Sequence, residues 1–424
     1  MKKVSLFDVC KSLATTIQSS DFLDKARKCK NSFIRKRKMP ICDMMYFMMS
    51  CKNRRLQSEL DEYFTKKGSD PVTRQAFSTK REYIKHEAFI DLNDVLVRKF
   101  ENEDGEIATY RGYRLFGVDG TIVDLPNNAE LRDYFGFSSN GTDKILAKGL
   151  GMTVFDVLNK ITLFAELYRC DDSENKRIHS ISDRFAELYN EKNIWLLDRG
   201  YPSFNLFKKF EDNKQNYLVR VSSSFLTEVN AANEPDQIVT VTRKSKTIKL
   251  RVINIELSSG ITEKLVTNVF EDFSVDDFKE LYAKRWGIET NYMFLKHKVM
   301  VEVFTGESVT AVLQDFHASI LILNIAAIAA REQDDILNEN NAICASGKNK
   351  GCKYRPNKTE LIAIIKRDFV KLMLCRNILN RVFKQFLLFR NIKRYAYLDI
   401  PNRKSIRNRH FKNNHRTSHS KSPL

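Results

Sequence analysis

The spacing of apolar residues changes near residue 110, and this change limits the folds open to the chain. Before it, apolar residues recur at helical spacing, and strand-like alternation is absent. After it, amphipathic stretches alternate with short apolar runs typical of strands, and the runs are 113–118, 152–158, 161–168, 193–197 and 216–221. Strands that alternate with helices predict an α/β layer with a mixed sheet.

The region before residue 110 predicts helices only, at 22–29, 42–49, 56–64 and 87–97. The sequence Pro71-Val72-Thr73 before RQAFSTKREYIKH is typical of a capped helix start with basic side chains. Such a helix fits two roles, a DNA-reading helix or a cationic surface helix. The spacing of its residues does not separate them.

An interruption and a basic end complete the predicted organisation. Residues 222–272 carry β-branched runs between polar turns and predict a small antiparallel insert. Helices follow at 278–299 and 314–332. Further basic helices are predicted to about residue 398, and a polar, disordered tail is predicted from Asn402.

The charge of the chain is concentrated near its end. The formal net charge of the 424 residues is +18, and residues 351–424 hold 19 Lys/Arg against three acids. A regional cationic excess of this kind indicates a polyanionic partner. With 42% hydrophobic residues, the rest of the chain excludes an intrinsically disordered protein.

Several classes of site and location are excluded by local pattern. Eight cysteines without a C-x-x-C pair argue against a zinc site and indicate reduced thiols. Asp8 and Lys11 interrupt the apolar start, which excludes a signal peptide. The most apolar run, 318–330, is too short to cross a bilayer. We therefore expect a soluble cytoplasmic protein with no membrane partner.

Four polar residues share one stripe of the predicted helix 278–299. At roughly 100° per residue they fall within about 60° of one another, and they are Tyr282, Arg285, Glu289 and Lys296. An apolar seam runs beside them, made of Leu281, Ile288, Leu295 and Val299. The simpler interpretation is a surface helix with ordinary charge pairs. A carboxylate and two cations beside a buried seam also suit a ligand site.

Two aspartates, Asp119 and Asp198, each follow an apolar strand. Ligand sites in α/β sheets favour strand ends, although each aspartate alone is more typical of a turn. Together with Glu289 they predict three carboxylates that converge from two strands and a helix. Such oxygen ligands suit Mg²⁺, and two ions about 3.5–4 Å apart can hold the oxygens of a phosphoryl transfer. Asp156 and Glu174 lack either position, so we predict core or surface roles for them.

Three stretches carry a family resemblance: FGVDGTIVDLPN, IWLLDRGYPSFNLF and YAKRWGIETNYMFLKHKVMVEVFTG. They resemble the DDE transposases of bacterial insertion sequences, in the insertion-sequence-4 family. That family's helix signature is Tyr, two residues, Arg, three residues, Glu, six residues, Lys, and positions 282, 285, 289 and 296 match it. The order of elements matches as well, including a β-rich insert between the second Asp and the Glu.

The resemblance implies an α/β fold with a ribonuclease-H-like catalytic core. It implies a helical DNA-binding region at 1–108, a catalytic domain at 109–335 with its insert at about 222–272, and a basic helical region and tail at 336–424. The implied reaction is cut-and-paste transposition, in which transposon ends are cleaved and joined to target DNA. Partners are double-stranded DNA, namely terminal inverted repeats and target, and a second copy of the chain in a homodimer on DNA.

The resemblance also assigns roles to the six residues of the site. Asp119, Asp198 and Glu289 would bind two Mg²⁺ ions, for which Mn²⁺ substitutes. Phosphates at the transposon end would be held by Tyr282, Arg285 and Lys296, which suits their hydroxyl or cationic chemistry.

One feature of the family is not matched. Relatives pass through a DNA hairpin and hold a flipped base against an aromatic residue of the insert. Here the tryptophans, Trp195 and Trp286, lie outside the insert, which leaves Phe225 or Phe270. Two other functions stay open: a ribonuclease-H-like nuclease that cuts without joining, and an inactive DNA-binding relic.

Overall fold

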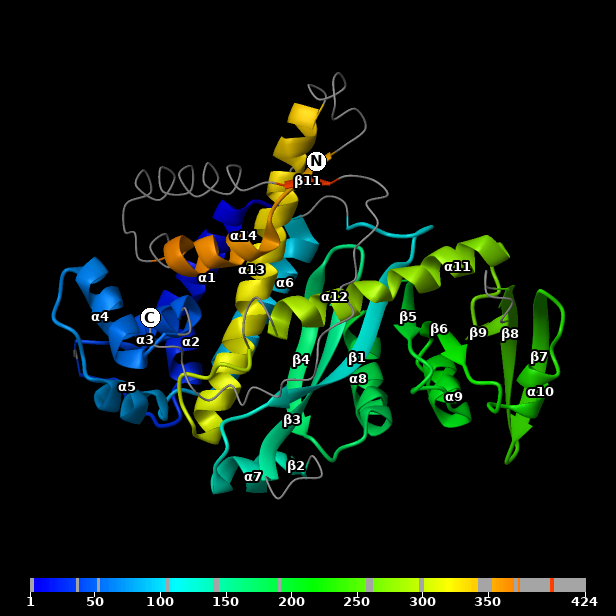
Figure 1. Ribbon diagram of the computed structural model, residues 1–424, viewed down its shortest axis with the longest axis horizontal. Helices are drawn as coiled ribbons and strands as arrows, with labels where there is room; N and C mark the ends of the chain where they lie inside the picture. Colours follow the sequence, from blue (N-terminus) through cyan, green and yellow to red (C-terminus); the bar gives the residue numbers. More distant parts are fainter. Residues whose placement is uncertain are drawn as a thin grey trace, which may run out of the picture. The chain divides into compact units, whose positions relative to one another are not determined.

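The computed structural model describes residues 4–35, 38–51, 54–103, 107–139, 145–189, 192–256, 262–296, 301–341, 353–369, 373 and 397–399. The chain forms two compact units (Figure 1). The helical unit comprises Met1–Gly105, Asp124–Tyr134 and Phe294–Leu424, and the α/β unit comprises Glu106–Val123 and Phe135–Met293. The three-part division predicted from the sequence stays a prediction.

The α/β unit is built on one mixed sheet in the order β2-β3-β1-β5-β6-β9-β8-β7, with β4 paired to β3 (Figure 1). Its strands are β1 (Arg114–Asp124), β2 (Phe137–Ser139), β3 (Ile145–Asp156), β4 (Ile161–Arg169), β5 (Asn193–Leu197), β6 (Asn216–Val221), β7 (Asp236–Arg243), β8 (Lys246–Glu256) and β9 (Thr262–Thr267). β5 pairs in parallel with β1 and β6, whereas β3 with β4 and β6 with β9 are antiparallel. The predicted mixed α/β fold class is confirmed.

Helices of this unit are α8 (Glu174–Leu188), α9 (Phe204–Asp212), α10 (Thr227–Asn230), α11 (Val275–Lys284) and α12 (Trp286–Phe294). The core gathers around Trp195 in the middle of β5, which is fully buried. Its ring meets Phe185 of α8 at 5.2 Å and Phe210 of α9 at 5.5 Å between centroids. Large aromatic rings therefore fasten both helices to the sheet.

The predicted insert is antiparallel, as expected, but it is not a separate sheet. β7, β8 and β9 pair in sequence, and β9 then pairs with β6 of the core. Along β8, Ile248, Leu250 and Val252 are buried and alternate with more exposed residues. This alternation gives the strand one apolar face, which allows it to extend the core sheet.

The helical unit contains α1 (Leu6–Gln18), α2 (Ser20–Ala26), α3 (Ile41–Ser50), α4 (Leu56–Lys67), α5 (Arg74–Arg81), α6 (Glu87–Glu103), α13 (Val309–Asn341) and α14 (Lys358–Ile364). α7 (Ala129–Phe135) falls at the boundary between the units. The predicted N-terminal helices are confirmed within a few residues, and α1 was not predicted. It begins with a capping box in which the side chains of Ser5 and Asp8 bond each other's backbone amides.

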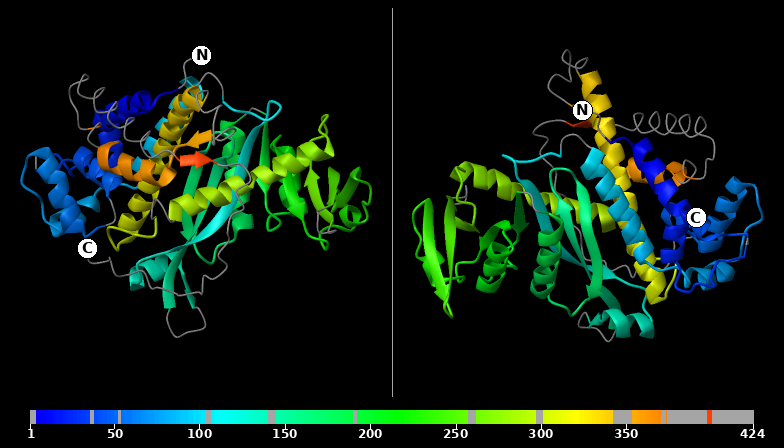
Figure 2. Two further views of the ribbon diagram at one scale, coloured as in Figure 1. Left: turned by 45° about the horizontal axis from the view of Figure 1, so that its top comes forward. Right: turned by 180° about the vertical axis from the view of Figure 1, so that it is seen from behind.

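α13 is the central helix of this unit, with α1 and α6 beside it (Figures 1 and 2). By length and composition its stretch Val309–Asp334 could cross a membrane, which corrects the expectation drawn from the shorter run 318–330. However, 83% of the apolar window is buried inside the protein. Its apolar surface is used for packing, which is consistent with a protein outside membranes.

Arg81 fastens the basic helix α5 to α13. Its side chain is 1% exposed and donates to Asp315 Oδ1 and Thr305 Oγ1 at 2.7 Å, and to Gln314 Oε1 at 2.8 Å. At the start of α5 the Thr73 hydroxyl accepts from the Ala76 amide, as the sequence predicts. One of the basic side chains on this helix is therefore structural.

The C-terminal region is described in part. α14 continues into a π-helical turn at Ile365–Phe369, and a short antiparallel pair joins β10 (Lys353–Arg355) to β11 (Tyr397–Asp399). Most of the predicted basic helices before residue 398, and the whole tail from Asn402, lie outside the described residues.

Candidate active site

The pairing of β1 with β5 brings the two predicted aspartates together. These strands are parallel, and Gly117 lies opposite Leu196. Asp119 lies two residues beyond Gly117 in β1, and Asp198 lies two residues beyond Leu196, directly after the end of β5. Neighbouring strands lie about 4.8 Å apart, and residues opposite each other in a pair point to the same face. Both residues are half-buried, and the charge of Asp198 acts on the Asp119 carboxyl.

β1 does not end at Asp119, as the sequence suggested, but continues to Asp124. The Asp-Gly pair resembles a turn in the sequence. In the structure the Asp119 carboxylate accepts from the Gly120 amide at 3.0 Å within an extended strand. Pairing with β3 on the other side carries β1 onward, although its partner β5 ends at Leu197. Asp119 therefore lies inside a strand, at the point where one neighbour stops.

The predicted helix 278–299 is two helices, α11 and α12, that meet at Arg285. Arg285 keeps helical backbone angles, but its amide bonds the Tyr282 carbonyl, and its carbonyl accepts from the Ile288 amide, each at 3.0 Å. Bonds that span three residues rather than four tighten the backbone locally. The prediction of one continuous helix was therefore wrong, because the backbone divides into two helices at Arg285.

α12 lies close against the sheet because two glycines leave room for it. A Cβ on Gly117 of β1 would stand 3.4 Å from Ile288 Cβ and 3.1 Å from Val157. Similarly, a Cβ on Gly287 would stand 3.0 Å from Val157 Cγ1. The helix turn that carries Glu289 is thereby seated on the strand that carries Asp119.

Tyr292, which was not among the residues predicted from the sequence, links α12 to the same strand. Its buried hydroxyl donates to the Asp119 carbonyl and accepts from Thr153 Oγ1 of β3 at 3.0 Å. On the helical projection Tyr292 falls at about 280°, between the apolar seam and the polar stripe. This position between the two stripes could have indicated that the Tyr292 hydroxyl points toward the core.

Three of the four stripe residues meet near Asp198. The Tyr282 hydroxyl stands 3.4 Å from Asp198 Oδ1, and Arg285 Nη2 donates to Glu289 Oε1 at 2.8 Å. The Arg285 guanidinium also lies over the Tyr282 ring, 5.7 Å from its centroid. Arg285 is nearly buried, whereas the side chain of Glu289 is 37% exposed. A cation and two acids therefore share one accessible edge of the unit.

Lys296, the fourth stripe residue, belongs to the helical unit. Its Nζ lies 3.5 Å from Glu302 Oε1, which also accepts from the Asp124 amide at 3.2 Å. The structure does not bring Lys296 together with the other three within one unit. Its predicted contact with DNA phosphate stays a prediction.

Negative charge is crowded around Asp119. Burial raises the pKa of this carboxyl to about 6, and the carboxylates of Glu174 and, less strongly, Asp198 add to the rise. The Gly120 amide and the Arg285 guanidinium oppose it. A bound cation relieves this kind of crowding.

Residues 110–325, just over half of the chain, match the transposase DDE domain. The chain belongs to this family. Family membership implies a transposase-type activity on DNA that depends on a divalent metal ion. The matched segment contains Asp119, Asp198 and Glu289 as well as the stripe.

A solved structure described as the piggyBac transposase synaptic complex with hairpin DNA is similar to this chain, with a TM-score of 0.44 and 12% sequence identity. The match covers 93% of this chain and 85% of the other. A comparison with curated protein sequences finds no match.

The donor set of this DDE domain fits a hard divalent cation. Asp119 offers carboxylate oxygens from β1 and Asp198 from the residue directly after β5, and Glu289 is accessible on α12. Carboxylates with room for water are the ligands that Mg²⁺ prefers. The crowded charge at Asp119 supports the same conclusion from an independent observation.

The two aromatic residues suggested for base stacking lie at opposite ends of strand β6. Phe225 follows the carboxyl end of β6, the edge that also carries Asp198, and packs edge-on against Phe207 at 5.7 Å. Phe270 is 48% exposed in a hollow of about 600 Å³ with Lys214 and Lys249, beside the amino end of β6. Because β5 and β6 are parallel, their carboxyl ends lie at the same side of the sheet. Phe270, at the amino end of β6, therefore lies at the opposite strand ends from Asp198. Phe225 is therefore the better placed of the two.

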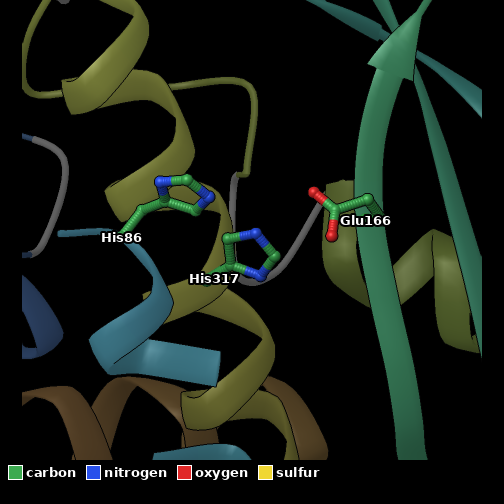
Figure 3. A group of neighbouring side chains, drawn as sticks. All are labelled: His86, Glu166 and His317. Carbon is green, nitrogen blue, oxygen red and sulfur yellow. The ribbon is translucent and has the colours of Figure 1, made fainter. Parts of the chain in front are cut away.

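A second group of titratable side chains lies outside the candidate site. The rings of His86, just before α6, and His317 on α13 stack with centroids 5.6 Å apart (Figure 3). Burial, with a smaller contribution from His86, lowers the pKa of His317 to about 3, so its imidazole is neutral near pH 7. Glu166, also drawn in Figure 3, belongs to β4 of the α/β unit. The stacked pair is a packing feature of the helical core.

Proposed function

We propose that this chain is a transposase that performs metal-dependent cut-and-paste transposition and belongs to the insertion-sequence-4 branch of its family. The observation that carries the proposal is the parallel pairing of β1 with β5, because Asp119 lies in β1 and Asp198 directly follows β5. The seating of α12 on Gly117 supports it, because this contact fixes the helix turn that carries Glu289.

In this proposal Asp119, Asp198 and Glu289 hold the divalent cations, two Mg²⁺ ions for which Mn²⁺ substitutes. When bound, the ions would neutralise charge on the transferring phosphate and activate the attacking oxygen. Arg285, held by Glu289 at 2.8 Å, keeps a positive charge beside the site. Tyr282 and Arg285 would contact DNA phosphates, as would Lys296.

The proposed partners are double-stranded DNA, namely the transposon's terminal inverted repeats and the target, and a second copy of the chain on that DNA. The net charge of +18 supports a polyanionic partner. We place the reaction in the cytoplasm. The closest rival is a nuclease of the same fold that cuts but does not join DNA.

The test separates DNA binding from cleavage on one fragment that ends in the inverted repeat flanking the reading frame. Glu289→Gln removes a metal ligand and one repulsive charge, so it should bind the fragment at least as well as wild type and cut nothing. Lys296→Ala should bind less tightly, by about 1–3 kcal/mol, and keep slow metal-dependent cutting. Glu280→Gln, on the exposed side of α11, is the matched control.

Binding is measured by gel shift and cleavage by the appearance of 3′ ends, with joined products scored on a target plasmid. Normal cutting by the Glu289→Gln variant would show that Glu289 is not a metal ligand. Cutting without joined products would favour the nuclease. A wild-type chain that binds but never cuts with Mg²⁺ or Mn²⁺ would indicate the relic.

A further inference from the structure

Glu174 lies against the strand that carries Asp119. It is the first residue of α8, and its side chain is half-buried. A Cβ on Gly120 would stand only 2.4 Å from Glu174 Cδ and from Oε1. The carboxylate therefore covers the backbone next to Asp119, in space that exists because residue 120 has no side chain. The sequence alone predicted only a core or surface role for Glu174.

The turn that begins at Asp198 holds Glu174 in this place. Tyr201, which is 2% exposed, donates its hydroxyl to Glu174 Oε2 at 2.5 Å. The Tyr201 amide bonds the Asp198 carbonyl at 3.1 Å, and Asn175 donates to the Gly200 carbonyl at 2.8 Å. Glu174 is thus bonded to the turn that begins at Asp198 and lies against the strand that carries Asp119. Oε2 is occupied by the phenol, and Oε1 lies on the side of Gly120.

This arrangement places like charges together. The carboxylate of Glu174 raises the pKa of Asp119 more than the carboxylate of Asp198 does. Among the described residues, the hydrogen bond given to Glu174 comes from a neutral phenol rather than a cation. A phenol orients a carboxylate without cancelling its charge. The negative charge therefore remains available to a ligand of opposite sign.

The geometry points to Glu174 as a fourth carboxylate of the metal site, one that binds the divalent cation together with Asp119. Tyr201 is its positioning residue. This inference rests on the proposed function, because it assumes that Asp119 is a metal ligand. The competing interpretation is that the Tyr201–Glu174 hydrogen bond only fastens α8 to the turn.

The experiment measures Mn²⁺ binding to the full chain without DNA, by the electron paramagnetic resonance signal of free Mn²⁺. Glu174→Gln keeps the size of the side chain and an acceptor for Tyr201 but removes the charge. It should raise the Kd for Mn²⁺ by about tenfold or more, since loss of an outer-shell partner alone costs about 10–100-fold. Tyr201→Phe should raise it by a smaller factor. Glu187→Gln, an exposed acid on the same helix, should leave it unchanged.

Asp119→Asn distinguishes the failure of this inference from the failure of the proposed function. If Asp119→Asn weakens Mn²⁺ binding while Glu174→Gln behaves like Glu187→Gln, Glu174 is structural and the inference is overturned. If Asp119→Asn also leaves binding intact, both proposals fail. Should Glu174→Gln lower the thermal unfolding midpoint, Tyr201→Phe decides: unchanged Mn²⁺ affinity in that variant also overturns the inference.

Discussion

Asp119 and His317 show how burial changes the pKa of an acid and of a base. Burial raises the pKa of the Asp119 carboxyl and lowers that of the His317 imidazole, because in each case it disfavours the charged form. Around Asp119, further carboxylates increase the effect, as a cation site requires. Around His317, the stacked ring of His86 adds only a little. The first environment suits ligand binding, and the second suits packing.

The neutral state of His317 predicts an acid-sensitive fold. Its ordinary pKa of 6.5 falls to about 3 in the folded protein. Below pH 6.5 the unfolded chain therefore takes up a proton that the folded chain does not, and stability is lost as the pH falls. The loss is about 1.4 kcal/mol per pH unit.

The thermal unfolding midpoint should consequently fall between pH 7.5 and pH 5.5, and His317→Gln should show a smaller fall over the same interval. Each protein is compared with itself at the two pH values, so the pH-independent loss of stability caused by the substitution does not affect the comparison. An equal fall in both proteins would show that His317 does not contribute to the acid sensitivity.

At the scale of elements, the helical unit depends on a buried cation that joins α5 to α13. Asp315 receives the Arg81 guanidinium and also the amide and hydroxyl of Thr305. Gln314 returns a hydrogen bond to the Arg81 carbonyl at 3.0 Å. Each polar atom in this group is satisfied by another member, so loss of one leaves several without partners.

Arg81→Met should therefore destabilise the protein by about 3–5 kcal/mol, because it leaves the largely buried Asp315 without its cation. Arg81→Lys should not restore stability, since an ammonium cannot reach three acceptors in the guanidinium geometry. Lys80→Met is the matched control, because Lys80 is the exposed neighbour on the same helix. Chemical denaturation followed by circular dichroism measures all three. Similar stability of the Arg81→Met and Lys80→Met variants would contradict the role given to this cluster.

For the whole molecule, the uneven distribution of charge predicts how DNA affinity depends on salt. Seven Lys/Arg lie beyond residue 400, namely Arg403, Lys404, Arg407, Arg409, Lys412, Arg416 and Lys421. If they contact phosphates, they release counterions on binding. Truncation after residue 400 should then reduce the slope of log Kd against log salt concentration.

Cleavage of pre-bound ends should be unaffected by the truncation, because the carboxylates belong to the α/β unit. A full-length variant with the seven cations replaced by Gln separates charge from chain length and should match the truncated protein. Fluorescence anisotropy at several salt concentrations gives the slope. A slope equal to that of wild type would show that these residues do not contact DNA.

Local patterns in the sequence determined the classes of element and the candidate residues. Apolar runs predicted β1, β5 and β6, and β-branched alternation predicted the antiparallel insert. Asp119, Asp198 and Glu289 were selected because they follow strands or share a helix stripe. Patterns of this kind are local, since each depends on neighbours along the chain whose side chains repeat with the period of the element.

Tertiary structure decided what those residues contact. The pairing of β1 with β5, the continuation of β1 past Gly120 and the pairing of β9 with β6 all depend on strands distant in sequence. Glu174 lies against the backbone next to Asp119, in space that Gly120 leaves open. Contacts of this kind arise from packing and hydrogen bonding between separate elements, which no local periodicity contains.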